Sequence, residues 1–285
     1  MKYYTLLIFL VSAIGISQQD NNLKEVSYTF NVNIFNYSEG IEYKSKLFFN
    51  DSTSLFIYNN SSIEGESGFF KKVKNRANSS NYVHLFRDYD DIGYKFFYNF
   101  NTKELTCREL LREQYEVIVK EKDIEFNWEI TKETKQIGKF ICYKALTKNF
   151  RGRNYEAWFT YDIPVATGPW KFHGLPGLIL EVHDDKNLVD ITFNSISDNI
   201  EEKIEFSEPT SDEIMSLDEY LIENFRLYTS FIDNQKGLKA TGQLPSNTMP
   251  LNYMNLEYNK EQIKLLNSYN QIEYDAYEKS LKSKE

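Results

Sequence analysis

Hydrophobic and polar residues alternate with a period of two near the start of the chain. Val26, Tyr28, Phe30, Val32 and Ile34 are each separated by one polar residue. This period is typical of a strand that buries one face. Further segments have strand character, with turns rich in Asn, Asp and Ser between them, as in an antiparallel meander. They are residues 43–49, 54–58, 82–87, 94–100, 105–110 and 115–121.

The strand pattern continues in the second half of the chain. Arg151, Gly152 and Arg153 predict a turn that leads from one long strand into the next. An acidic turn, residues 184–187, joins another strand pair. The segments predicted as strands are residues 128–130, 139–150, 155–161, 178–183 and 188–196.

From about residue 210 the spacing between hydrophobic residues increases from two to three or four positions. Ile214, Leu217, Leu221, Phe225 and Tyr228 recur every three or four residues, which predicts a helix over residues 210–232. Residues 260–282 show the same spacing and predict a second helix. The chain is therefore expected to be mainly β, a curved antiparallel sheet with a helical C-terminal part over about residues 210–285.

The first 17 residues have the layout of a signal peptide. One positive charge, Lys2, precedes a short apolar run, and Gly15 and Ser17 are small residues at positions −3 and −1 of a cut before Gln18. The run is too short to span a bilayer, which takes about 20 residues. The alternative is a buried N-terminal strand or helix. We expect residues 1–17 to be removed and residues 18–285 to form one domain.

Composition narrows the function classes. The net charge is −9 with both signs interspersed, which argues against a nucleic-acid binder. No later stretch predicts a membrane span, and no Cys follows the apolar run to carry a lipid. We therefore expect a periplasmic or secreted protein that is not integral to the membrane. The 21 Tyr and 21 Phe favour strands; an aromatic-lined ligand pocket is the alternative.

The chain has two cysteines, Cys107 and Cys142. In an oxidising compartment such a pair predicts a disulfide. Closing a loop of roughly 35 residues would contribute about 3–4 kcal/mol. The alternative is two unrelated thiols, with that of Cys142 buried.

The densest motif is Gly174-Leu175-Pro176-Gly177-Leu178-Ile179. Leu175, Pro176 and Gly177 fit a type II turn, since Pro presets its φ and Gly accepts a positive φ at the next position. Pro176 also keeps Leu175 out of the helical region. The motif therefore predicts a rigid corner that leads into a buried strand.

The same string resembles the motif of the GLPGLI family, exported proteins of Gram-negative bacteria. Similar patterns occur at Trp128-Glu129-Ile130, Cys142, Ala157-Trp158 and Ile163-Pro164. The resemblance implies an envelope protein of unknown biochemical function, often encoded beside outer-membrane TonB-dependent receptors. Residues 135–145 and the next strand also resemble strand pairs of periplasmic lipoprotein carriers, whose curved sheet forms a half-open barrel.

Candidate chemistry is sparse. Phosphate-binding glycine loops, zinc-type Cys spacing and a Gly-x-Ser-x-Gly elbow do not occur, so we expect no catalytic residues, cofactor or metal. Two alternatives stay open: a nucleophilic Cys142 paired with His84, His173 or His183, and a metal site of His173 with His183, Asp184 and Asp185. A solvent-exposed hairpin end is the plainer interpretation of the acidic turn.

Trp158, Trp170, Phe172 and His173 are the candidate binding residues, for a pocket or a partner surface; core packing is the alternative. The leading hypothesis is a non-catalytic envelope protein that binds a hydrophobic ligand or docks to an outer-membrane partner. The rivals are a hydrolase or thiol-based enzyme that uses Cys142 and a His, and a structural or surface protein.

Overall fold

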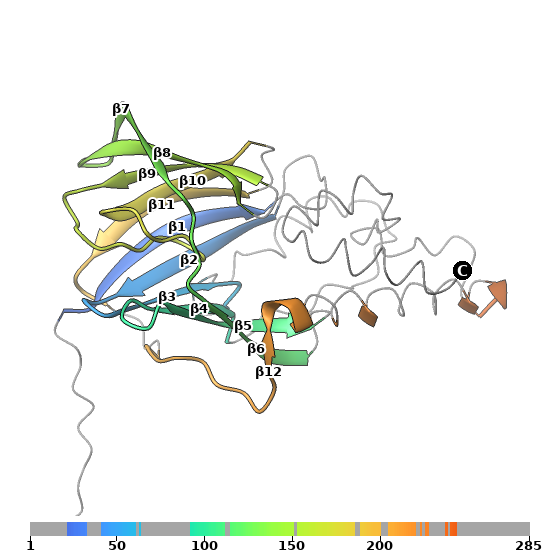
Figure 1. The fold of residues 1–285 in the computed structure, drawn as a ribbon. Helices are drawn as coiled ribbons and strands as arrows, with labels where there is room; N and C mark the ends of the chain where they lie inside the picture. Colours follow the sequence, from blue (N-terminus) through green and yellow to red (C-terminus); the bar gives the residue numbers. More distant parts are fainter. Residues whose placement is uncertain are drawn as a thin grey trace, which may run out of the picture.

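The computed structural model describes residues 22–32, 41–60, 63, 92–111, 115–150, 153–185, 189–200 and 205–220, with isolated positions up to 243. The predicted signal peptide, the strand at 82–87, His84 and the helix at 260–282 lie outside these residues. Within the described part, all strands belong to one sheet (Figure 1). They are β1 (Lys24–Val32), β2 (Ile41–Phe49), β3 (Thr53–Tyr58), β4 (Tyr94–Asn99), β5 (Glu104–Leu111), β6 (Tyr115–Lys122), β7 (Glu129–Ile137), β8 (Phe140–Phe150), β9 (Arg153–Thr160), β10 (Leu178–Asp184), β11 (Val189–Ser197) and β12 (Ile214–Ser216).

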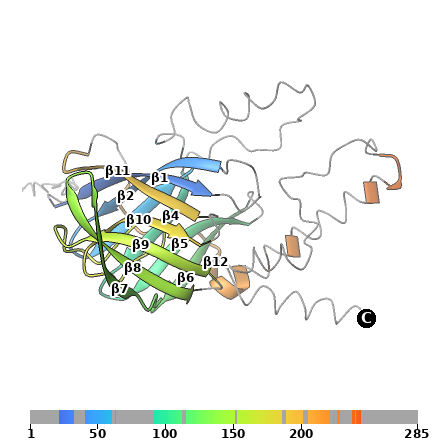
Figure 2. The same ribbon diagram turned by 90° about the horizontal axis from the view of Figure 1, so that it is seen from above.

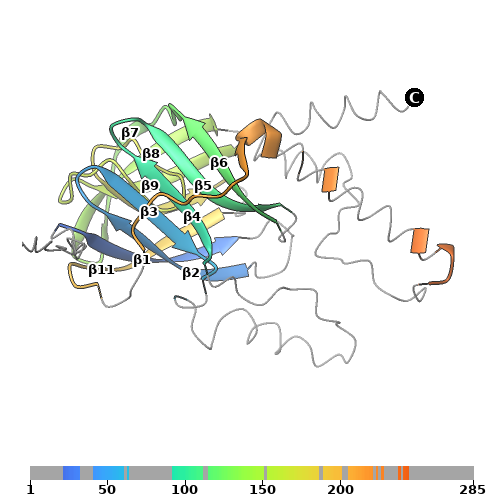
Figure 3. The ribbon, with the colours of Figure 1, turned by 90° about the horizontal axis from the view of Figure 1, so that it is seen from below.

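The sheet is curved and open. Its strand order is β12-β6-β5-β4-β3-β2-β1-β11-β10-β9-β8-β7, and every neighbouring pair is antiparallel except β12 with β6. The half that contains β8 and β9 curls over the half that contains β5 and β6, as the side view and the views from above and below show (Figures 1, 2 and 3). The predicted mainly β fold with a curved antiparallel sheet is confirmed.

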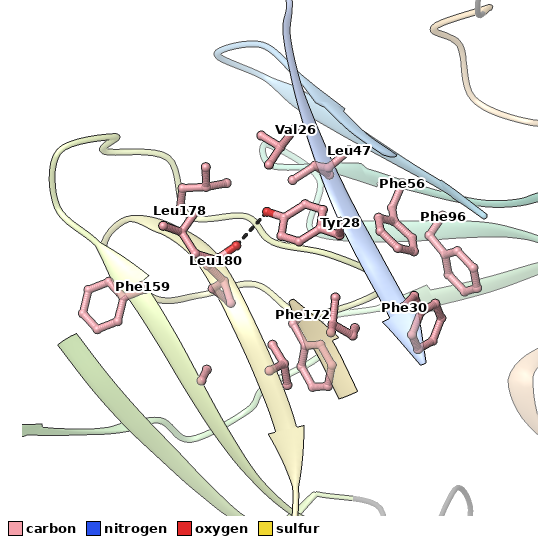
Figure 4. Close-up of a cluster of buried hydrophobic side chains, with 14 of the residues drawn as sticks. Val26, Tyr28, Phe30, Leu47, Phe56, Phe96, Phe159, Phe172, Leu178 and Leu180 are labelled. Carbon is pink, nitrogen blue, oxygen red and sulfur yellow. Dashed lines mark hydrogen bonds between the residues drawn. The ribbon is translucent and has the colours of Figure 1, made fainter. Parts of the chain in front are cut away.

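Side chains of both halves meet on the concave face in one core. Tyr28, Phe30 and Phe56 pack there with Phe172 and the strand β10 (Figure 4). Much of the aromatic content thus serves core packing. A smaller cluster of Phe48, Leu55, Ile57 and Phe97 packs on the opposite face, because successive side chains of a strand point to opposite sides.

Most predicted strands are observed within two residues of their bounds, but β7 is longer than the predicted residues 128–130. Its residues 131–136 are polar and mostly exposed. The strand β7 lies at the edge of the sheet. A charged edge strand has no buried face, so it shows no hydrophobic period.

The predicted helix start at residue 210 is wrong. Ile214 belongs to β12, which pairs in parallel with β6, and the described helical residues of this segment begin at 217. Ser216 caps the start of this helix. Its hydroxyl accepts a hydrogen bond from the amide of Glu219 at 3.3 Å. The carboxylate of Glu219 in turn accepts a hydrogen bond from the amide of Ser216 at 2.8 Å. This reciprocal pair is a capping box.

The predicted disulfide is not formed. Cys107 in β5 and Cys142 in β8 are both buried thiols. Seven strands separate β5 from β8 in the sheet order. The Cys142 thiol instead contacts the carbonyl of Phe140 at 3.9 Å. In the part of the chain that the structure describes, no helix is long and apolar enough to cross a bilayer.

Candidate functional site

Residues 161–177, which connect β9 to β10, carry most of the predicted site residues. Backbone hydrogen bonds fold this segment back on itself: the amide of Gly174 donates to the carbonyl of Ala166 at 3.2 Å, and that of Ile179 to Thr167 at 3.0 Å. The Thr167 hydroxyl also donates to the hydroxyl of Ser54 in β3 at 2.8 Å. The segment is therefore tied both to the strand that follows it and to the opposite half of the sheet.

Three of the four predicted binding residues come together. The Trp170 ring lies 5.6 Å from that of Phe172, and Phe172 is 1% exposed. The His173 imidazole stacks on the Tyr98 ring at 4.1 Å and meets Phe126 edge-on at 5.2 Å. Core packing accounts for Phe172, whereas His173 sits at the boundary between the core and a pocket.

The fourth residue, Trp158, makes its contacts elsewhere. Its indole N–H donates to Glu156 at 2.8 Å. The Lys135 ammonium lies over its ring, 4.3 Å from the centroid, and Lys135 also pairs with Glu181. These residues belong to an ionic network on β7, β9 and β10, so the structure does not join Trp158 to the other three.

The predicted type II turn is wrong in its detail. Gly174, not Gly177, has a positive φ, of +91°. Gly177 is required for space, because a Cβ there would lie 2.0 Å from the backbone oxygen of Thr160. The two glycines therefore serve different needs: Gly174 allows a positive φ, and Gly177 allows a close backbone approach.

A pocket of about 400 Å³ adjoins this corner. We call it the corner pocket. Residues 123–128, between β6 and β7, form one wall together with Ile130 of β7, and residues 173–176 form another. Its apolar lining is Ile124, Phe126, Trp128, Ile130, Leu175 and Pro176, beside Tyr98. Its polar lining is Lys103, Asp123, Glu125, Asn127 and His173.

The walls of the corner pocket are fixed by one bond and one stack. The Trp128 indole N–H donates to the carbonyl of His173 at 2.9 Å. The Trp128 ring lies parallel to that of Phe126 at 5.5 Å. A donor thus satisfied leaves the apolar ring of Trp128 as the surface that lines the pocket.

His173 is neutral at physiological pH. Burial lowers its pKa to about 4, although the negative charge of Glu121 opposes this shift. Its Nε2 is buried without a hydrogen-bond partner among the described residues. Burial also raises the pKa of Tyr98, and the nearby Asp123 adds to this. The pocket wall is therefore uncharged at His173 and Tyr98.

A buried charged group that sequence reasoning missed includes Glu121, whose negative charge acts on His173. The Lys171 ammonium lies 3.5 Å from the carboxylate of Glu121, and their side chains are only 10% and 7% exposed. Burial raises the pKa of Glu109 to about 7, while Lys171 lowers it. The Lys171 ammonium also lies over the ring of Trp170 at 5.0 Å. One signal was present: Glu109 occupies an inward position in the alternating series Leu105, Cys107, Glu109, Leu111.

The alternative metal site is not assembled. His183 pairs with Asp190 at 2.6 Å and Glu181 at 3.4 Å, and the hydrogen bond to Asp190 is the main reason that its pKa rises to about 9. Asp184 instead accepts from the amide of Val189 and lies near Arg153. Over the described residues, no group of three His, Cys, Asp or Glu side chains could hold a metal ion.

A family model described as a protein of unknown function (Porph_ging) matches residues 148–181, which include the 174–179 motif. A search of curated proteins gives no match.

Solved structures give distant likenesses. Two crystal forms of PNGF-II match with TM-scores of 0.44 and 0.48 and sequence identities of 16% and 17%, over 68% and 72% of this chain. The chain spans about a third of the length of PNGF-II, 31% and 33%. An uncharacterized conserved protein from Thermus thermophilus matches with a TM-score of 0.33 and 9% identity, over 69% of this chain and 91% of its own. These scores are too low to support a conclusion about function. By sequence, the corner and its flanking strands are similar to a family of unknown function.

Proposed function

We propose that this protein is an exported, non-catalytic binding protein of the cell envelope, and that its ligand is small, largely apolar and held in the corner pocket. The observation that carries this proposal is the pocket itself. Its volume of about 400 Å³ falls in the range of small-molecule sites, about 300–1,000 Å³. Such sites combine apolar and aromatic walls with a few polar groups, and the corner pocket has both.

The proposed location rests on sequence. The layout of residues 1–17 supports export, and the absence of a Cys after the apolar run supports a released protein in the periplasm or the medium. The resemblance of the 174–179 motif to the GLPGLI family supports an envelope role. The same resemblance suggests an outer-membrane TonB-dependent receptor as a partner.

The proposal of a non-catalytic role is supported by the state of Cys142. Burial, together with the negative charge of Glu181, raises the pKa of its thiol to about 11. A nucleophilic cysteine needs a lowered pKa and access to substrate, and Cys142 is fully buried. The thiol-based alternative therefore loses the residue on which it depends.

The experiment uses N-phenylnaphthylamine, an uncharged probe whose fluorescence rises in apolar sites. Ile130 lines the pocket and is 43% exposed, whereas Ile141 in β8 is similarly exposed, 51%, but is not among the lining residues. Ile130→Trp should fill the pocket and weaken probe binding at least tenfold, and Ile141→Trp should leave it unchanged. A protein that does not bind the probe, or two variants that behave alike, would show the proposal to be wrong.

A further inference from the structure

We propose that the ligand of the corner pocket is an apolar ring compound that carries an ammonium group. This inference rests on the proposed function and specifies its ligand class. Two properties of the pocket support it: the aromatic rings of its walls, and two carboxylates in its polar lining that form no ion pair with a described residue.

Two aromatic rings of the lining are held in place. Trp128 is fixed by its stack on Phe126 and by its hydrogen bond to the carbonyl of His173. Tyr98 is fixed by its parallel stack on the His173 imidazole, 4.1 Å away. Fixed rings suit a planar apolar ligand, since little side-chain entropy is lost on binding. The faces of Trp and Tyr also attract cations within about 6 Å.

Two carboxylates lie in the same lining. Asp123 and Glu125 line the pocket and are both exposed, and neither forms an ion pair with another described residue. The charge of Asp123 contributes to the raised pKa of Tyr98, so its negative potential reaches the aromatic wall. A bound ammonium group could thus contact a carboxylate and a ring face together.

One lining residue opposes a cationic ligand. Lys103 is the one cation among the described lining residues, and His173 is neutral because its pKa is about 4. Two carboxylates against one ammonium leave the lining net negative. The whole chain carries −9, which adds a long-range attraction for cations. Lys103 therefore weakens the preference without reversing it.

The test compares three compounds with the same indole ring: tryptamine, tryptophol and indolepropionate, which are cationic, neutral and anionic at pH 7. Calorimetry at low ionic strength should give tryptamine about tenfold tighter binding than tryptophol, from one cation–π contact and one or two partly screened ion pairs. Indolepropionate should bind more weakly than tryptophol. The preference should shrink with added salt.

Variants assign the preference to the pocket. Asp123→Asn with Glu125→Gln should bring tryptamine down to the affinity of tryptophol, and Lys103→Met should strengthen tryptamine binding. Glu129→Gln, an exposed carboxylate outside the lining, is the matched control and should change nothing. If N-phenylnaphthylamine binds and the three indoles bind with equal affinity, the proposed preference for a cationic ligand is wrong, whereas the proposed binding of apolar ligands in the corner pocket is supported. If neither the probe nor any indole binds, both proposals fail.

Discussion

The phenol of Tyr28 in β1 donates a hydrogen bond of 2.8 Å to the carbonyl of Ile179, the last residue of the 174–179 motif (Figure 4). Both residues are fully buried. The bond therefore anchors the end of the corner to a strand 151 positions earlier in the chain.

Tyr28→Phe removes this bond without removing the ring. We expect the free energy of unfolding to fall by about 1–2 kcal/mol, because the Ile179 carbonyl stays buried and loses a donor. Tyr115→Phe is the matched control, since Tyr115 is 58% exposed, and it should change stability by less than about 0.5 kcal/mol. Urea unfolding checks both. Equal effects of the two variants would mean that the bond contributes nothing measurable.

We expect substitution by Ala to lower the free energy of unfolding more at Gly177 than at Gly174. Gly177→Ala places a Cβ 2.0 Å from the Thr160 backbone oxygen, so the strands must shift, at a cost of about 3 kcal/mol. Gly174→Ala has room but suffers from its φ of +91°, at a cost of about 1 kcal/mol. Gly237→Ala meets nothing within 4 Å and should be neutral or slightly stabilising. Thermal unfolding of the three variants should rank them in this order.

The corner shows how far sequence reasoning reaches. The Pro-Gly pair predicts a tight corner before a buried strand, because Pro fixes its own φ and Gly, which lacks a side chain, allows a close backbone approach. The reason for Gly177 could not be predicted, because the oxygen that a Cβ would meet belongs to Thr160 in the neighbouring strand. The length of the charged edge strand β7 does not follow from sequence for a similar reason, because its pairing with β8 exists only in the folded sheet.

The cysteines predict a simple labelling result. Both thiols are buried and no disulfide joins them, so a thiol reagent should label neither within minutes in the native protein. In denaturant without reductant, both should react. Burial raises the pKa of Cys142 to about 11, so it should stay slow even at mildly alkaline pH. A protein that yields no reactive thiol until it is reduced would contradict the structure.

Substitutions of Lys171 and Glu121, which form an ion pair, should have strongly non-additive effects on the free energy of unfolding. Lys171→Met leaves two buried carboxyl groups, Glu121 and Glu109, without this ammonium, and should cost about 3–5 kcal/mol. Adding Glu121→Gln removes one of the two charges and should recover more than about 1 kcal/mol. Urea unfolding of the single and double variants gives the coupling energy. Purely additive effects would show that the pair does not interact.

This pair also marks the limit of sequence reasoning at the site. His173 was a candidate because it follows two aromatic residues beside the motif. Its partners Tyr98 and Glu121 come from strands that approach it only when the sheet curls. Glu109 stood at an inward position of its strand, which is an anomaly in sequence, but the neighbouring Lys171 is 62 positions away and could not be paired with it from a single chain.

Glu109 makes stability depend on pH with a defined sign. Its pKa rises from 4.5 to about 7, chiefly because of burial. Between these values the native state holds a proton that the unfolded chain has lost, so stability falls as pH rises. The loss is complete at about pH 8 and is at most about 3.5 kcal/mol, since each of the 2.5 pKa units corresponds to about 1.4 kcal/mol.

Glu109→Gln should remove this dependence. The free energy of unfolding of the variant, relative to that of the native protein, should therefore increase as the pH rises from 5 to 8. His173 acts with the opposite sign: its pKa is lowered from 6.5 to about 4, so its contribution is lost as pH falls through that range. Because His173 is present in both proteins, the difference between them isolates Glu109. Urea unfolding at pH 5, 6, 7 and 8 measures it. A difference that stays constant over this range would show that Glu109 ionises as an ordinary surface carboxyl group does.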